Sequence, residues 1–211
     1  MLFRSIELAY SLMAGACGIE MEPCRLLEEN DRAHFMTRRF DRRADGTKVH
    51  TQTLCALDQL DFNLADTHSY AQYLDVIDRL DLGPDAREQG FRRLVFNVAG
   101  ANRDDHTKNL SFCCDEDGTW SLSPAYDVNH AYNPQGRWTQ RHQMSVNGKF
   151  EDITRADLLE LADRYVVPAP AQVIDDVSEA ISRWPSFAQE AGVEEFDVVR
   201  IAGDLAAFRP R

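Results

Sequence analysis

Residues 91–127 read FRRLVFNVAGANRDDHTKNLSFCCDEDGTWSLSPAYD, and the rest of the chain is organised around this stretch. Its apolar residues between Phe91 and Val98 recur at helical spacing, and Gly100 is a typical stop for a helix. The next residues, 101–109, include two acids, a histidine, a lysine and two asparagines. A buried connection does not need so many polar groups, so the pattern predicts a buried helix that leads into a functional loop.

A β-hairpin is predicted directly after this loop. Residues 110–114 and 120–123 are short apolar segments, and the turn sequence between them, residues 115–118, ends in glycine. Asp127 follows where the second strand is expected to emerge. The stretch therefore places one more acid close to the polar loop.

The spacing of three residues in this stretch is typical of phosphoryl transfer. Asp104 and Asn109 have four residues between them, as do the Asp and the Asn of a kinase catalytic loop. In that chemistry an Asp orients the attacking hydroxyl, and the Asn binds a metal ion. A second Asp binds metal from the other side, and Asp127 stands where that acid is expected.

At these residues the sequence resembles the HipA family, the serine/threonine-kinase-like toxins of bacterial toxin–antitoxin systems. The resemblance covers roughly residues 6–184 and rests on four segments in family-like order: 39–42, 95–97, 104–111 and 122–127. It implies an α+β fold, namely a mainly α-helical, protein-kinase-like C-terminal lobe with small β-hairpins and a truncated N-terminal lobe. It also implies the activity of an ATP-dependent serine/threonine kinase that uses Mg²⁺.

The resemblance assigns roles to individual residues. Asp104 is expected to be the catalytic base, and Asn109 and Asp127 the magnesium ligands. Contacts to the nucleotide are expected from the hinge and from the residue before the last acid: Arg39, Phe40, Asp41 and Tyr126. Support of the loop is expected from His106 and Lys108.

Without the resemblance, the residues also allow interpretations in which they have no role in catalysis or binding. Asp and Asn are common in loops because they bond their own backbone, and the basic run around Phe40 suits a solvated edge. Asp105 and Lys108 are expected to be solvated or paired with each other. His106 suits a packed or hydrogen-bonded loop residue whose ring nitrogen braces the turn, and Tyr126 suits a core aromatic.

Two parts of the chain are expected, with a boundary at residue 43. Residues 1–43 would be a remnant of the N-terminal lobe with the hinge, and residues 44–211 the helical C-terminal lobe with the catalytic loop. A hairpin is predicted at 25–28 and 33–37, whereas residues 48–61 have a mixed pattern. Helices are predicted at 5–17 (capped by Ser5), 70–80 (capped by Ser69 or Asp66), 84–100, 158–165 (preceded by a capping sequence at Thr154), 170–184 and 194–208.

Parts of a kinase site are missing before the hinge. A kinase-like site needs a phosphate-covering loop and a lysine on an early strand. The segment before residue 39 has no Gly-rich loop, and the first lysine of the chain is Lys48. A missing N-terminal lobe is therefore expected as a further partner, and ATP binding by this chain alone is expected to be weak.

Composition limits the other partners. The formal net charge of −12 argues against direct contact with nucleic acid, which requires clustered lysine and arginine. No apolar segment is long enough for a membrane span, and five cysteines without a CxxC pair favour a reducing cytoplasm. By the resemblance, the expected partners are a protein substrate and a HipB-like DNA-binding antitoxin.

Three classes of function remain at this point. The first is a HipA-like kinase or its C-terminal fragment. The second is a catalytically silent module that keeps the fold to bind an antitoxin. The third is a metal-dependent phosphohydrolase built on Asp104, Asp105, His106 and Asp127, although the other histidines lack ligand spacing.

Overall fold

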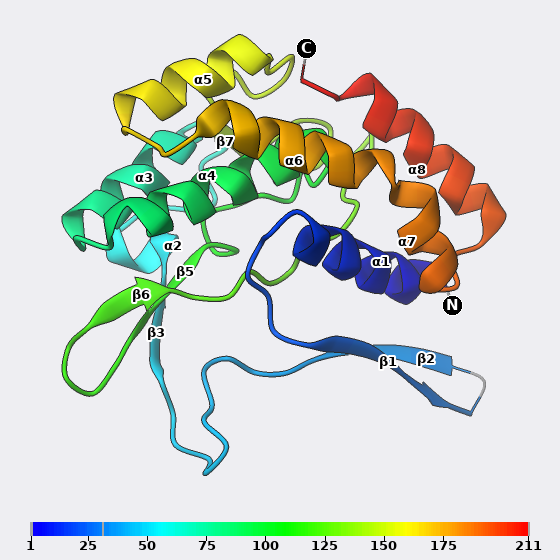
Figure 1. Cartoon of the computed structure of the whole chain (residues 1–211), viewed down its shortest axis with the longest axis horizontal. Coiled ribbons are helices and arrows are strands. Elements are labelled where there is room, and N and C mark those ends of the chain that lie inside the picture. The colour runs from blue at the N-terminus through cyan, green and yellow to red at the C-terminus, as the bar shows by residue number, and fades with distance from the viewer. Residues whose placement is uncertain (1, 31, 211) are drawn as a thin grey trace.

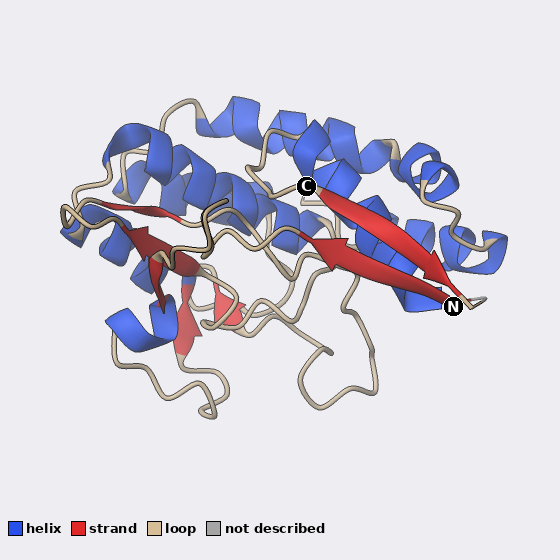
Figure 2. Ribbon diagram, turned by 90° about the horizontal axis from the view of Figure 1, so that it is seen from below, coloured by secondary structure: helices blue, strands red, loops and turns tan. Residues whose placement is uncertain are grey.

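The computed structural model describes residues 2–30 and 32–210. The helices form the upper part of the molecule in Figure 1, and two small antiparallel sheets lie below them. Seen from below, the two sheets are separate and the longer hairpin extends toward one end of the molecule (Figure 2). The fold is therefore a mixed α+β fold dominated by helices, as expected from the sequence.

The helices are distributed over the whole chain. Their bounds are α1 Leu2–Ala16, α2 Leu54–Leu57, α3 Tyr70–Arg79, α4 Gly83–Ala99, α5 Arg155–Arg164, α6 Pro170–Ser182, α7 Trp184–Glu190 and α8 Glu195–Ala207.

The strands form three small sheets. Their bounds are β1 Cys24–Glu29, β2 Arg32–Thr37, β3 His50–Thr53, β4 His68–Ser69, β5 Ser111–Cys114, β6 Trp120–Leu122 and β7 Met144–Ser145. β1 pairs with β2, β5 lies between β3 and β6, and all these pairs are antiparallel. β4 and β7 form a short parallel pair.

α4 is the central helix, and every residue in its last ten positions, 90–99, is buried. It packs against α3 on one side and α6 on the other. Gly90 permits the contact with α3, since a Cβ at this position would lie 2.7 Å from Cδ1 of Ile77. Gly100 caps the helix as predicted, and Ala101 then turns the chain with a φ of 53°. The central helix therefore ends where the polar loop begins.

α1 joins the β1–β2 hairpin to the helices. It contacts both strands of the hairpin and also α6 and α7. The Tyr10 hydroxyl donates a hydrogen bond to the carbonyl of Gly100 at 2.8 Å, so α1 also touches the end of α4. The expected boundary at residue 43 stays a prediction.

Several predicted helix ends are confirmed by their caps. Ser69 and Gln72 form a capping box at the start of α3, and Thr154 and Asp157 form one at the start of α5. The predicted cap at Ser5 is wrong, because α1 already begins at Leu2.

One other prediction needs correction. The helix expected at 170–184 is two helices, because Pro185 cannot continue α6 and instead occupies the first turn of α7. The mixed segment 48–61 contains β3 and the short helix α2. In the described residues, no helix has both the length and the apolar character needed to cross a membrane.

Candidate active site

The polar loop is fixed to the end of α4 by buried amides. Asn97 on α4 donates a hydrogen bond from Nδ2 to the Tyr70 hydroxyl at 3.0 Å. Asn102 in turn donates from Nδ2 to Oδ1 of Asn97 at 2.9 Å. Because both asparagines are buried, these bonds set the direction in which the chain leaves the helix.

Asp105 ties the same loop to two distant segments. Its carboxylate is fully buried, and Oδ2 accepts from the Tyr70 hydroxyl at 2.7 Å and lies 2.9 Å from Nδ1 of His142. Oδ1 accepts from the backbone N–H of Gln143 at 2.7 Å. The prediction that Asp105 is solvated or paired with Lys108 is wrong, because tertiary partners bury it.

The environment of Tyr70 fits this arrangement. Burial, and then the nearby Asp105 carboxylate, raise the pKa of the Tyr70 phenol well above its ordinary value. The hydroxyl therefore stays protonated and donates to Asp105 while it accepts from Asn97. The Tyr70 hydroxyl thus has both a donor and an acceptor partner, and these bonds help to hold the loop.

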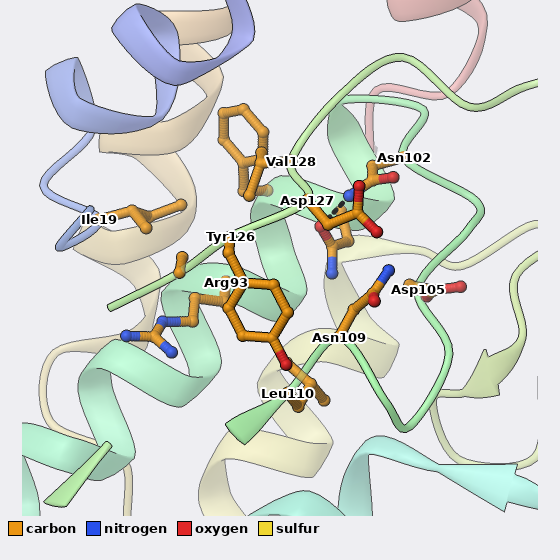
Figure 3. A pocket seen from close by; sticks show the side chains of 12 residues that line it. Ile19, Arg93, Asn102, Asp105, Asn109, Leu110, Tyr126, Asp127 and Val128 are labelled. Atoms are coloured by element: carbon orange, nitrogen blue, oxygen red, sulfur yellow. Dashed lines mark hydrogen bonds between the residues drawn. The ribbon is translucent and has the colours of Figure 1, made fainter. Parts of the chain in front are cut away.

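A small pocket opens between the loop, α4 and the segment after β6. Its cavity volume is about 20 Å³, which is room for roughly one water molecule. Figure 3 shows the lining side chains gathered from these elements around one space. The polar lining residues are Arg93, Asn97, Asn102, Asp105, Asn109, Tyr126 and Asp127. The structure thus brings Asn109 and Asp127, the two predicted metal ligands, to the same pocket.

Asp104 lies beside this pocket without lining it. Its side chain is 45% exposed, and its carbonyl oxygen accepts a hydrogen bond from Nδ2 of Asn109 at 2.9 Å. This bond fixes the Asn109 amide, so that Oδ1 is free to meet a ligand. The exposed carboxylate of Asp104 is accessible to a second molecule.

The two residues expected to support the loop act mainly through their backbones. The carbonyl of His106 accepts from the N–H of Asn109 at 2.9 Å, while its ring lies 3.8 Å from Asp104, too far for a hydrogen bond. The carbonyl of Lys108 accepts from the Tyr126 hydroxyl at 2.6 Å. The Lys108 ammonium lies 3.5 Å from the ring centroid of Phe62, in a cation–π contact.

Asp127 stands at a sharp turn after the hairpin. Its φ of 55° is in the left-handed region, which aspartate tolerates better than most residues. Burial, and then the Asp127 carboxylate, raise the pKa of Glu7 on α1 above its ordinary value. A second carboxylate that the sequence did not suggest therefore lies near this acid.

The hinge residues reach the site through one aromatic contact. The ring of Phe40 lies 5.5 Å from that of Tyr126, centroid to centroid. Arg39 forms a two-pronged pair with Asp41, with nitrogen–oxygen distances of 2.7 and 2.6 Å, and Arg42 adds a third contact to Asp41. Arg39 and then Arg42 hold the pKa of the Asp41 carboxyl below its ordinary value. The hinge is thus ordered mainly by ion pairs at the surface.

The donors in the pocket fit a hard cation. Asn109 and Asp127 supply an amide and a carboxylate, and the buried Oδ1 of Asn102 in the same pocket has no hydrogen-bond partner among the described residues. Magnesium prefers such oxygen ligands and is usually bound by one or two carboxylates together with water and phosphate. The described residues contain no group of three or more His, Cys, Asp or Glu suited to a metal ion.

The geometry does not favour the phosphohydrolase. That centre requires Asp105 as a metal ligand, yet both of its oxygens are engaged by protein donors. His106 forms no ring hydrogen bond among the described residues that would orient it toward a metal. The set of four residues therefore does not form a shared metal centre.

Sequence reasoning missed several residues of the site. Asn102, Arg93 and Tyr70 were not singled out, because asparagine, arginine and tyrosine are ordinary components of loops and helices. A weak signal was present for Asn102, which begins the polar run directly after the helix stop. No local signal marked Tyr70 or His142, whose roles depend on contacts with Asp105 across 35 and 37 residues of sequence.

Comparison with known proteins gives a consistent result. A family model for the HipA-like C-terminal domain matches residues 2–204. The chain is similar to HipA of Shewanella oneidensis MR-1, solved in complex with HipB and its operator DNA. The TM-score is 0.73 at 18% identity, over 97% of this chain and 55% of that one.

A second similar structure is the proinflammatory kinase CtkA of Helicobacter pylori. Here the TM-score is 0.59 at 11% identity, over 98% of this chain and 84% of that one. No curated protein sequence matches the chain significantly. At these identities the two structures show a shared fold, and the chain spans about half the length of the Shewanella HipA.

Proposed function

Because the chain belongs to the family of HipA-like C-terminal domains, we propose that it is the catalytic portion of a HipA-like serine/threonine kinase, which transfers the ATP γ-phosphoryl group to a protein hydroxyl. The observation that supports this most is the shared pocket of Asn109 and Asp127, next to Asp104. A kinase needs such an arrangement, because its catalysis consists mostly of positioning and charge stabilisation.

Asp104 is the proposed catalytic base. Its exposed carboxylate is free to accept a hydrogen bond from the hydroxyl of a substrate protein and to orient that hydroxyl for attack. The Asn109 amide, held by the Asp104 carbonyl at 2.9 Å, couples the position of the base to the metal-binding side of the loop.

Asn109 and Asp127 are the proposed magnesium ligands, with Asn102 as a further oxygen in the pocket. Magnesium, when bound, would neutralise charge on the nucleotide phosphates. These oxygens are kept in place because Asn102 is bonded to Asn97 on α4 and Asp105 is bonded to Tyr70 on α3. The protein thus contributes orientation, and little rearrangement is needed on binding.

Nucleotide binding is proposed to involve the hinge, where Arg39, Phe40 and Asp41 would meet adenine and ribose next to Tyr126. The pocket itself has room for only about one water molecule, so the triphosphate would lie outside it. A separate N-terminal lobe, joined at a boundary near residue 43, would cover the phosphates.

A HipB-like DNA-binding antitoxin is the proposed partner. The support is the Shewanella HipA, which was solved together with HipB and operator DNA. The net charge of −12 suits contact with a basic protein surface better than contact with DNA itself.

The silent binding module is the second candidate, because the pocket of Asn109 and Asp127 has room for only about one water molecule. Calorimetry with ATP, with and without Mg²⁺, separates the two. The kinase proposal predicts weak, magnesium-dependent binding that tightens when the N-terminal portion of a HipA-like protein is added. Failure of any magnesium-dependent binding in the combined sample would favour the silent module. Tight binding by the chain alone would show that the phosphate-binding parts are misplaced.

A further inference from the structure

A second cavity lies behind the catalytic loop and contains a buried arginine. Its volume is about 330 Å³, much larger than that of the pocket that holds Asn109 and Asp127. The charged and polar residues that line it are Arg103, His142, Glu151, Asp152, Thr154 and Arg209. This cavity plays no part in the proposed phosphoryl transfer.

Arg103 is the residue that requires explanation. It is only 6% exposed, and among the described residues it donates one hydrogen bond, from Nη1 to the carbonyl of Gln140. Nε is buried without a partner, and no ion pair to Arg103 is found among the described residues. A buried guanidinium normally has carboxylate or several carbonyl partners, because removing its charge from water is costly.

Two aromatic rings restrict how Arg103 can be satisfied. Its Cζ lies 4.5 Å from the ring centroid of Tyr132 and 4.0 Å from that of Phe208. Because the rings pack against the guanidinium, further partners are left mainly to its N–H edge. That edge suits the oxygens of a planar or tetrahedral anion.

His142 adds a second group to the same cavity. Its Nδ1 is engaged by Asp105 at 2.9 Å, and the residue also lines the cavity. Arg209 supplies another cationic side chain in the lining.

We propose that this cavity is a binding site for a phosphate-class anion, held by the N–H edge of Arg103 with His142 and Arg209. A phosphate offers more oxygens than a carboxylate does, which matches the separate donors of Arg103 and Arg209. The exposed carboxylates of Glu151 and Asp152 lie at the rim and oppose the anion, so the affinity is moderate. Removing one of them strengthens binding.

The proposed anion site is linked to the catalytic loop through residues that neighbour or contact that loop. Arg103 is the residue before Asp104, and His142 is bonded to Asp105, which lines the other pocket. An anion that orders Arg103 and His142 therefore orders both neighbours in the loop. Any consequence for phosphoryl transfer rests on the proposed kinase function, whereas anion binding itself does not.

The test is a titration of the whole chain with inorganic phosphate, without nucleotide or Mg²⁺, followed by calorimetry and by NMR of the arginine and histidine side chains. We expect saturable binding with shifts at Arg103 and His142. Arg103→Gln should weaken binding at least about tenfold, the loss expected for one charge-assisted pair. Arg92→Gln is the matched control, since Arg92 is equally buried but already paired with Glu88 and Asp176. It should leave phosphate affinity unchanged.

Two exposed variants keep the test decisive if Arg103→Gln does not fold. Glu151→Gln should tighten phosphate binding, and Arg209→Ala should weaken it. Absence of saturable binding to the wild-type chain would overturn the proposal, as would wild-type affinity in Arg103→Gln. Unchanged affinity in both rim variants would place the phosphate elsewhere and overturn it as well.

A phosphatase-treated sample distinguishes the source of the anion. If inorganic phosphate binds only after treatment, and mass spectrometry shows loss of a phosphoryl group from the protein, the occupant is a phosphorylated residue of the chain. Equal binding before and after treatment identifies a free anion. Both results support the site, because each requires a phosphate group at Arg103.

Discussion

The polar loop of residues 101–109 and the predicted hinge, residues 38–43, both contact Tyr126, yet they are held in different ways. The loop is bonded to α3, to α4 and to the segment before β7 by largely buried groups, above all Asp105, whose carboxylate is fully buried. The hinge is ordered by surface pairs between Arg39, Arg42 and Asp41 and by one ring contact from Phe40. Surface pairs stabilise little, whereas a buried polar network fixes one conformation.

The difference shows that the two segments predicted to form the site are supported unequally in this chain. The loop that carries Asn109 is held to the helices through the buried hydrogen bonds of Asn102 and Asp105. The hinge lacks such support, because the β1–β2 sheet has only two strands among the described residues. We therefore expect the loop to keep its geometry in the isolated chain and the hinge to gain order from a partner.

The largest expected effect concerns Asp104 in the loop. Asp104→Asn should reduce phosphoryl transfer by about 10²-fold or more in any preparation that shows activity, because the amide cannot accept the hydroxyl proton. The melting temperature should hardly change, since the carboxylate is exposed and the bond to Asn109 uses the backbone. Phosphate incorporation and thermal melting on the same sample check both statements. Full activity in this variant would remove Asp104 from the mechanism.

The next effect is on stability and compares the two regions directly. Asp105→Ala should lower the free energy of unfolding by about 3 kcal/mol, because Tyr70, His142 and Gln143 lose their buried acceptor. Asp41→Ala in the hinge is the control and should cost much less. Urea denaturation of both variants measures the difference. Equal losses in the free energy of unfolding would mean that the hinge contributes as much to stability as the loop does.

A third prediction uses pH and concerns the loop after Asp127. Nε2 of His130 in this loop lies 3.0 Å from Asp204 on α8, and burial lowers the pKa of the imidazole below its ordinary 6.5 although Asp204 opposes this. A lowered pKa means that the unfolded chain binds the proton first as pH falls. The contribution of His130 to stability is therefore complete above pH 6.5 and is lost as pH falls from there toward the lowered value.

The measurement is the free energy of unfolding at several pH values between neutral and mildly acidic. The wild-type chain should lose stability as the pH falls, and His130→Gln should show a flatter profile. Identical slopes in the two proteins would show that His130 does not titrate differently on folding.

The smallest effect is expected at the contact between the two regions. Phe40→Ala removes the ring that meets Tyr126 and should cost about 1 kcal/mol, the usual worth of an aromatic pair. Hydrogen exchange should rise in the hinge, residues 38–43, and remain unchanged in the loop, residues 101–109. Faster exchange in both segments would mean that the hinge supports the loop.

The same contrast explains what the sequence could predict. Caps at Ser69 and Thr154 and the stop at Gly100 are local signals, and the structure has all three. β3 was missed because His50–Thr53 has no apolar alternation and its partner, β5, comes much later in the chain. The spacing of Asp104, Asn109 and Asp127 can also be recognised in the sequence, although the roles of these residues stay predictions. The burial of Asp105 could not be predicted from the sequence, because it depends on contacts with residues from separate segments.

The most direct test of the account is to find where a divalent cation binds. Mn²⁺ takes the same hard oxygen ligands as Mg²⁺, and its unpaired electrons broaden NMR signals of nearby nuclei. In the whole chain, low Mn²⁺ should broaden the signals of Asn109 and Asp127 first, and excess Mg²⁺ should reverse the effect. Asp127→Asn should abolish the selective broadening. Selective broadening elsewhere, with the signals of Asn109 and Asp127 unaffected, would contradict the assignment of this pocket as the metal site of a kinase.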